Sequence, residues 1–425
     1  MRFAPLFAAT SLFALATPVW AFEGGATDPV GDAPTSEAVS TEAATAATVP
    51  ASQTAAPAPK AEKKSGFELK PRWRLQYDAG KVSVPDNVNA PGMGWNDMLR
   101  RAYIGVDAKF GGGFSSRVEM ELAGADPEFT DAYVAYDTKT LNVTAGQQKF
   151  FQSLDDMTSD LNTSFSERAA FTQAFGFTRR LGVSSTIKKD AFLIQTGVST
   201  EPLIGLNDVK DNSIGVDGRV VWSPKMGDTQ LHLAGSAHWR DRNDMANSTL
   251  RYRARPFVRT TDTRFVATPG LTVDKELSYG LEAGMVKGRL HATGEAYWMN
   301  PSVRNAADPS LWGGYAEVGF FLTNDSRPYK GGTWGTIKPK KPFGSGGIGA
   351  VQLNARYDYL DLNSGSITGG QQKTMAGSLI WTPIENVRFA ANYAHLKFND
   401  ARIAATNGDR DYSADALLFR FQIHY

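Results

Sequence analysis

The sequence contains no cysteine among its 425 residues. Disulfide bridges and thiolate metal sites are therefore excluded, and backbone pairing and packing must stabilise the fold. Beyond the N-terminus no segment approaches the ~18 consecutive apolar residues of a membrane-spanning helix, which disfavours helical spans. The formal net charge is only +1, so the overall charge indicates no class of partner. Any charge signal must come from the placement of charges along the chain.

The first 21 residues have the pattern of a secretory signal peptide. Met1 and Arg2 form a short positive leader, an apolar run follows from Phe3 to Thr17, and Val19 to Ala21 place small residues before Phe22. About 15 apolar residues are few for a membrane span of ~20, which argues against an N-terminal anchor. The sequence thus predicts an exported protein with a signal peptide at residues 1–21.

Residues 22–65 are rich in Ala, Pro and Thr. From Glu23 onward this segment has no aromatic residue and only three Val as larger aliphatic residues. Such a composition cannot bury enough apolar surface to form a core. A tether to the cell wall and a short Ala-rich coiled coil are alternatives, but Pro recurs throughout. We therefore predict a disordered periplasmic linker.

From Phe67 onward, apolar and polar residues alternate. In Phe114–Leu122 the even positions are mainly apolar, and the odd positions are Ser115, Arg117, Glu119 and Glu121. A period of two with this contrast is typical of a strand between two different media. Sixteen such strands are expected, at residues 67–77, 99–110, 114–123, 130–137, 140–147, 180–188, 191–199, 213–223, 229–239, 277–286, 289–299, 313–322, 349–359, 372–382, 386–398 and 413–425.

The connections between these strands alternate between tight turns and longer polar loops. An even strand count with this alternation is typical of bacterial outer-membrane barrels. In lipid an open sheet edge would leave backbone groups unpaired, so the sheet must close. We predict an all-β fold, a 16-stranded antiparallel transmembrane barrel at residues 66–425 in a Gram-negative outer membrane. A soluble β-sandwich is the alternative.

The last strand ends the chain on an aromatic residue. From Leu417 to Tyr425 the odd positions are apolar and are expected to face lipid, while Arg420, Gln422 and His424 are expected to meet water in the lumen. Outer-membrane barrels characteristically end in a lipid-facing aromatic residue that the assembly machinery reads. Tyr425 is predicted to be this assembly signal.

An ordered set of motifs resembles the phosphate- and pyrophosphate-selective porins, the porin O and P family. The resemblance extends over essentially everything after the linker and implies homotrimeric, sixteen-stranded barrels that pass phosphate-like anions. The motifs are, in order, LRRAYIGVDAKF, DAYVAYDTKTLNVTAGQQKF, FSERAAF, RYRARPF, YGLEAG, GEAYW, LTNDSRPY and ARYDYLDLN followed by GG.

Arginines concentrate in the long connection between the ninth and tenth strands. Arg251, Arg253 and Arg255 follow one another at period two, with Arg259 beyond Pro256. An extended segment with this spacing points three guanidiniums along one face. The resemblance implies that this loop folds into the lumen as an arginine ladder. The alternative is a basic surface loop that binds lipopolysaccharide phosphates.

A second basic segment connects the twelfth and thirteenth strands. It carries Arg327, Lys330, Lys338, Lys340 and Lys341, and strand parity makes it periplasmic. The family folds a long periplasmic turn into the barrel, which suggests a basic exit that attracts anions. An exposed basic turn is the alternative.

The loop Gln148–Thr178 follows the fifth strand, where general porins form their constriction. The family match brings Lys149 and Arg168 from this region together with Asp131 and Arg101 from neighbouring strands. An aspartate beside arginines would accept a hydrogen bond from a protonated phosphate oxygen. Asp155, Asp156 and Asp160 form an acidic run that would repel anions if it faced the pore. The family's usual Arg-Pro-Glu is here Arg-Pro-Phe, at Arg255–Phe257.

Motifs of catalysis are absent from the sequence. Gly344–Gly349 matches the pattern G-x-G-x-x-G of dinucleotide-binding proteins but has neither the preceding strand nor the following helix, so it is read as a turn. The five histidines are scattered and belong to no hydrolase motif. No enzyme activity, metal or cofactor is therefore predicted, with an outer-membrane hydrolase of dispersed residues as the alternative.

Three functions remain. The first is an anion-selective porin, the second a less selective porin for sugars or other small nutrients, and the third a soluble periplasmic β-protein that binds polysaccharide. The expected partners are phosphate-like anions, outer-membrane lipid and lipopolysaccharide, the assembly machinery and two further copies in a homotrimer, without nucleic acid.

Overall fold

The computed structural model describes residues 66–203, 213–242 and 249–425. The predicted signal peptide and linker lie outside the described residues. Within them, no helix is both long enough and apolar enough to cross a membrane.

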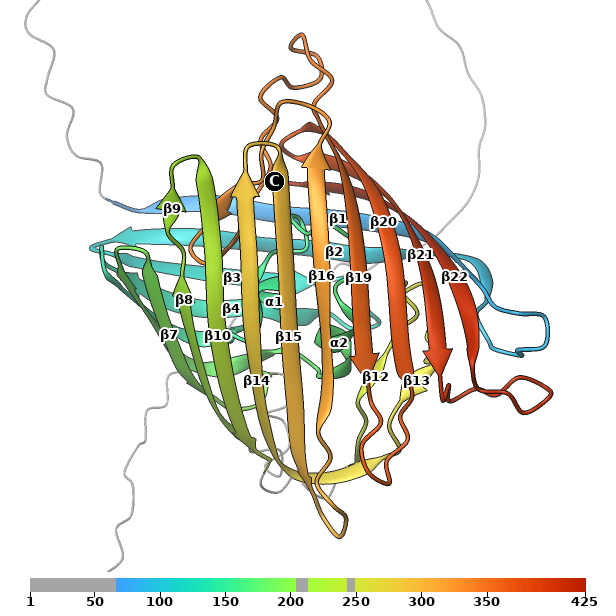
Figure 1. Cartoon of the computed structure of the whole chain (residues 1–425). Coiled ribbons are helices and arrows are strands. Elements are labelled where there is room, and N and C mark those ends of the chain that lie inside the picture. Colours follow the sequence, from blue (N-terminus) through green and yellow to red (C-terminus); the bar gives the residue numbers. More distant parts are fainter. Residues whose placement is uncertain (1–65, 204–212, 243–248) are drawn as a thin grey trace, which may run out of the picture. The chain divides into compact units, whose positions relative to one another are not determined.

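Sixteen antiparallel strands form a closed barrel (Figure 1). Each strand pairs with the next, and β1 pairs with β22 to close the sheet. The strands are β1 Glu68–Ser83, β2 Gly94–Gly111, β3 Phe114–Glu121, β4 Glu128–Asp137, β5 Leu141–Lys149, β6 Arg179–Lys189, β7 Phe192–Ser199, β8 Ile214–Trp222, β10 Thr229–Asp241, β14 Leu271–Lys287, β15 Leu290–Val303, β16 Leu311–Phe321, β19 Ala350–Asp361, β20 Gln371–Ile384, β21 Val387–Asn399 and β22 Tyr412–His424.

The predicted barrel is confirmed, since each observed barrel strand overlaps one expected strand. The largest differences are at strand ends: β1 extends to Ser83, β2 begins at Gly94 and β14 begins at Leu271. Backbone pairing continues there beyond the lipid-facing band, where side chains no longer alternate in polarity. Short elements that alternation did not indicate are α1 Leu154–Met157, α2 Ala170–Ala174, β9 Lys225–Met226, β11 Thr249–Leu250, β12 Arg253–Ala254, β13 Val266–Ala267, β17 Tyr329–Lys330 and β18 Thr333–Trp334.

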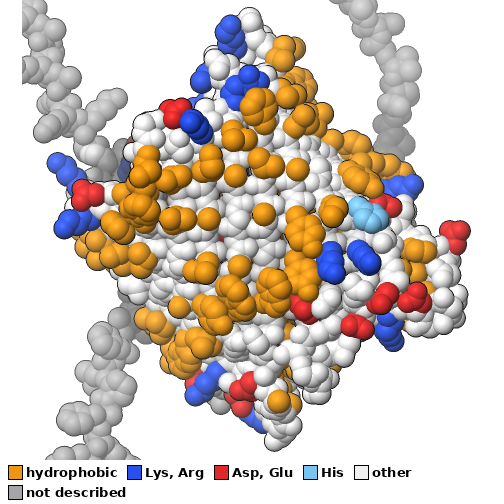
Figure 2. Space-filling model, in the orientation of Figure 1, with side chains coloured by type: hydrophobic (Ala, Val, Ile, Leu, Met, Phe, Trp, Pro, Cys, Tyr) orange, Lys and Arg blue, Asp and Glu red, His pale blue; other side chains and the backbone are white. Residues whose placement is uncertain are grey.

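The two faces of the barrel differ as the alternation requires. On β20, Met375 and Leu379 point outward and are 65% and 46% exposed, whereas Thr374 and Ser378 point inward and are buried. Figure 2 shows hydrophobic side chains spread over the outer face. Trp381, Phe389 and Phe421 form a row of contacting rings near the ends of the strands that hold the short turns. Such aromatic girdles mark the membrane interfaces of outer-membrane barrels.

One wall of the lumen is covered from inside. The inner loop, residues 150–178, contains α1 and α2 and lies within the barrel (Figure 1). The Phe171 ring stacks on Tyr297 of β15 at 5.6 Å. Glu295 of β15 accepts a hydrogen bond from the Leu154 N–H at 2.9 Å, and Asp358 of β19 accepts one from Ala170 at 2.8 Å.

The inner loop also corrects one expectation. Arg420 and Gln422 of β22 point inward, but they are 5% and 1% exposed and so do not meet water in the lumen. The Arg420 guanidinium pairs with Asp78 of β1 at 2.6 Å and with Glu167 of the inner loop at 2.9 Å. For these two residues the prediction of water contact was wrong, because a loop distant in sequence covers this wall.

The long turn, residues 322–349, adds a second insertion. Its hairpin β17–β18 places Trp334, 3% exposed, in contact with Leu154 of the inner loop and Val286 of β14. The Tyr329 hydroxyl lies 2.6 Å from the Nδ1 atom of His232. Among the described residues, the open part of the lumen therefore lies mainly on the side of β1–β6.

Candidate functional site in the barrel lumen

A cavity of about 990 Å³ lies between the inner loop, strands β1–β6 and the arginine loop, which comprises residues 249–270. Fourteen arginines and Lys149 line it, against eight carboxylates. The cavity brings together eight of the predicted site residues: Arg101, Asp131, Lys149, Arg168, Arg251, Arg253, Arg255 and Arg259.

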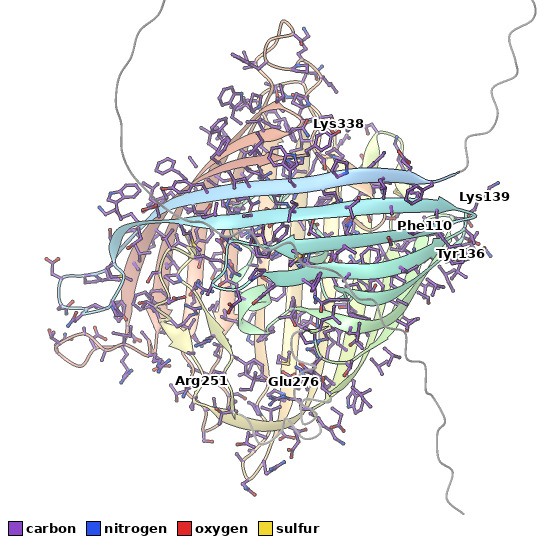
Figure 3. The ribbon with its side chains drawn as sticks, turned by 180° about the vertical axis from the view of Figure 1, so that it is seen from behind. Phe110, Tyr136, Lys139, Arg251, Glu276 and Lys338 are labelled. Atoms are coloured by element: carbon purple, nitrogen blue, oxygen red, sulfur yellow. The ribbon has the colours of Figure 1, made fainter. Side chains whose placement is uncertain are left out.

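The arginine loop presents alternate side chains to the cavity. Arg251 and Arg253 are exposed, whereas Tyr252 and Ala254 between them are 2% and 1% exposed. The backbone is held extended because β12 pairs with β13, with Arg253 opposite Ala267. The Tyr252 hydroxyl anchors the loop to the wall through a 2.8 Å hydrogen bond to Glu276 of β14. Figure 3 labels Arg251 and Glu276 at this end of the barrel.

The guanidiniums of this loop are only partly neutralised. Arg255 pairs with Asp262 at 2.8 Å, and the Asp262 side chain is 93% exposed. No described carboxylate lies within 4.0 Å of the guanidinium of Arg251, Arg253 or Arg264. Burial and the neighbouring Arg255 and Arg253 guanidiniums lower the pKa of Arg264 to about 10. Like charges are therefore concentrated on one side of the cavity.

A β-bulge places two consecutive arginines on the opposite wall. Gln76 of β1 is paired with Arg101 of β2 while Tyr77 is paired with Leu99, so Arg100 is the extra residue. Both Arg100 and Arg101 consequently line the cavity. Arg101 pairs with Glu121 at 2.8 Å.

Asp131 lies beside two arginines that the sequence reasoning did not select. The Arg179 Nε atom donates to its carboxylate at 2.6 Å, and Arg117 lies 3.7 Å away. Both arginines point inward from strands that neighbour those of Asp131 and Lys149. The alternation of inward and outward residues along β3 and β6 would have indicated this orientation from the sequence. The pair provides a donor and an acceptor at one point of the wall.

The acidic run of the inner loop is neutralised within the barrel. Asp156 pairs with Lys149 at 3.1 Å, and Asp160 pairs with Arg74 and Arg101. The Asp155 carboxylate is turned away from the cavity and accepts a hydrogen bond from the Ala169 N–H at 2.9 Å. The run thus presents no uncompensated negative charge to the cavity.

Arg168 and Glu167 fix the inner loop in place. Arg168 donates to the carbonyls of Asp155 and Thr158 in the same loop. Glu167 pairs with Arg100, Arg259 and Arg420, so it joins the inner loop to the arginine loop and to two strands. Burial raises the pKa of Glu167, but these three guanidiniums outweigh it and lower the pKa to about 2.

Comparison with known proteins identifies the family. Residues 69–425 match the model of the family described as phosphate-selective porin O and P. The chain belongs to this family. It is therefore an outer-membrane porin and not an enzyme. An uncharacterized protein of Caulobacter vibrioides is 41% identical over 365 residues, which cover 84% of this chain and 74% of that protein.

Solved porins share the fold of this porin. The anion-selective porin from Comamonas acidovorans has a TM-score of 0.55 at 11% identity and covers 84% of this chain and 100% of its own. In-vitro folded OmpT, an outer membrane protein of Vibrio cholerae, also has a TM-score of 0.55 at 11% identity, covering 87% and 100%. These likenesses establish the barrel architecture.

Four predicted residues of this porin lie away from the cavity. Lys338, Lys340 and Lys341 are exposed on the long turn, and Lys338 pairs with Glu385 at 2.7 Å (Figure 3). Their part in a basic exit stays a prediction. Tyr425 is 67% exposed, and its backbone pairs with that of Trp73 on β1. Its role in assembly likewise stays a prediction.

Proposed function

We propose that this porin conducts small phosphate-like anions across the outer membrane. The observation that carries the proposal is the row of Arg251, Arg253 and Arg255 along one side of the cavity, with two of the three free of any described carboxylate partner. A guanidinium presents forked donors that match phosphate oxygens. A pair of unit charges 4 Å apart attracts by roughly 4 kcal/mol at an effective dielectric constant near 20.

Passage requires that the anion also leaves each site. With several arginines in a row, the anion can exchange its contact with one guanidinium for a contact with the next, so that no single site traps it. Arginines deeper in the cavity, such as Arg101 and Arg179, already hold a carboxylate. They attract an anion less strongly than the free guanidiniums of the arginine loop. The anion is thus captured at the extracellular side and passed toward weaker sites.

The Asp131–Arg179 pair would favour hydrogen phosphate over chloride. Arg179 donates to an anionic oxygen, and the Asp131 carboxylate accepts a hydrogen bond from the protonated phosphate oxygen. Chloride carries no proton and gains nothing from the carboxylate. A less selective nutrient porin is the second candidate, because eight carboxylates also line a cavity large enough for a sugar.

Two bilayer measurements separate these candidates. In a salt gradient of potassium chloride, the reversal potential of the anion channel should have the sign of anion preference. Added inorganic phosphate should then reduce the chloride current. A channel without anion preference, or a chloride current unaffected by phosphate, would support the nutrient porin. We also propose a homotrimer, and detergent-resistant trimers should be recovered from the outer-membrane fraction.

A further inference from the structure

Two lysines face outward side by side on neighbouring strands of the barrel. Lys373 of β20 is directly opposite Lys397 of β21 in the sheet register. Their neighbours along each strand, Thr374 and Leu396, point inward and are 1% and 0% exposed, so both lysines point to the outside. Adjacent strands are ~4.8 Å apart, and like charges directly opposite one another destabilise a sheet.

Neither lysine is neutralised by a described residue of the protein. In the parts of the chain that the structure describes, no carboxylate lies within 4.0 Å of either ammonium. The nearby outward carboxylates are engaged by other donors. Asp361 accepts from Gln371 at 2.8 Å, and Asp415 accepts from Tyr393 at 2.7 Å and lies 2.9 Å from His395.

The pair lies where the barrel leaves the hydrocarbon layer. Met375, the first outward apolar residue of β20, is paired with Tyr357 of β19, and Tyr393 of β21 is also half-exposed. These tyrosines mark the aromatic girdle on the side of the long loops, as Trp381 and Phe389 mark the girdle on the side of the short turns. Lys373 and Lys397 lie just beyond it, on the side of the long loops, at the level of the outer-leaflet headgroups. Figure 2 shows basic side chains near a histidine and acidic side chains over this part of the outer face, at the right of the view.

We propose that Lys373 and Lys397 form a binding site for the phosphate group of a phosphorylated glycolipid in the outer leaflet. One phosphate can accept hydrogen bonds from both ammonium groups and relieve their mutual repulsion. Ser413 of β22 lies opposite Lys397 in the same row and offers a third donor. The acyl chains of the lipid would then lie along the adjacent apolar band of the barrel, over Met375 and Leu379. The site lies outside the lumen and does not depend on the proposed anion pathway.

The test uses the full-length mature porin in detergent micelles and native mass spectrometry. Diphosphorylated lipid A is the probe, and its dephosphorylated form reports binding by acyl chains alone. Lys373→Gln/Lys397→Gln should bind the phosphorylated probe about tenfold or more weakly than the parent, since both positive charges that attract the phosphate are removed. The dephosphorylated probe should bind both proteins equally.

A matched control is Lys139→Gln/Lys225→Gln, which removes the same charge from exposed residues in the turns at the other end of the barrel. It should retain binding of the phosphorylated probe, and both double variants should keep the parental conductance. Equal binding by the Lys373/Lys397 variant and the parent would overturn the proposal, as would an equal loss in the control. If the Lys373/Lys397 variant lost its oligomers even without added lipid, the two lysines would instead be assigned to a contact with a second copy of the chain, and the proposal would be overturned.

Discussion

At the scale of single residues, the arginine loop is the part of the molecule most open to test. Replacing Arg251, Arg253 and Arg255 together by Ala removes three forked donors from the cavity and changes no residue of the sixteen barrel strands. The phosphate block of the chloride current should weaken by at least about tenfold, because hydrogen bonds to charged groups contribute ~1.5–3 kcal/mol each. Low salt is preferable, since the screening length is ~10 Å at 0.1 M.

The matching control replaces Lys139, Lys189 and Lys225 by Ala. These exposed lysines lie in or beside the short turns, do not line the cavity, and carry the same total charge. The control should keep the block. An unchanged block in the arginine variant would count against the arginine loop as the anion path.

Glu167 of the inner loop forms the ion pair that joins this loop to the arginine loop, and it also pairs with two arginines of the barrel strands. Glu167→Gln removes the negative charge and leaves the buried guanidiniums of Arg100 and Arg420 with less compensation. Breaking a buried ion pair from one side costs about 3 kcal/mol or more of unfolding free energy. The variant should unfold at a lower temperature at pH 7, measured by circular dichroism in detergent. Glu128→Gln, at an exposed carboxylate without an ion pair, should leave the transition unchanged.

The same residue makes a pH prediction. The pKa of Glu167 is about 2 in the folded barrel, below the ~4.3 of an unfolded glutamate. A lowered carboxyl pKa contributes stability above the unfolded value, and that contribution is lost as the pH falls toward 2. The stability difference between parent and Glu167→Gln should therefore be largest at neutral pH and shrink between about pH 4.5 and 2. A difference that grows on acidification would contradict this role.

At the scale of elements, β22 decides whether the barrel closes. It pairs with β1 from Arg74 to Ser83, and the Tyr425 backbone adds two hydrogen bonds with Trp73. Tyr425→Asp places a charge at the lipid-facing end of this strand and removes the predicted assembly signal. The variant should accumulate in the periplasm or be degraded, measured by fractionation and immunoblotting. Tyr425→Phe keeps the aromatic ring and should assemble, and a normal yield from the Asp variant would sink the prediction.

At the scale of the whole molecule, the described strands form a closed barrel by themselves. Among the described residues, the pairings that close the sheet run from β1, which begins at Glu68, to β22. The predicted linker lacks core-forming residues, so a variant with the signal peptide fused directly to Lys63 should still insert and conduct. Single-channel conductance equal to that of the parent is the expected result. Loss of the folded barrel on this deletion would show that the linker takes part in assembly.

The near-zero net charge of the molecule hides a strong internal segregation. The wall formed by β15–β22 is covered by the inner loop, and its inward Arg356 and Arg420 are held in buried ion pairs, such as Arg356–Glu317 at 2.6 Å. The wall of β1–β6 remains open to the cavity, where basic side chains outnumber carboxylates. The amino-acid composition alone could not indicate this separation of charge, because it adds together the charged residues of both walls.

The sequence by itself determined the sixteen strands, their two faces and the spacing of Arg251, Arg253 and Arg255. These features are local, because a strand between lipid and water must alternate in polarity along its own length. Only the tertiary structure decided which inward residues meet the cavity. Arg420 is covered by Glu167, which lies 253 positions away, and Asp160 is neutralised by Arg74 of β1. The bulge at Arg100 and the facing of Lys373 with Lys397 arise from the register between strands, and a single strand's own pattern carries no information about its partner's register.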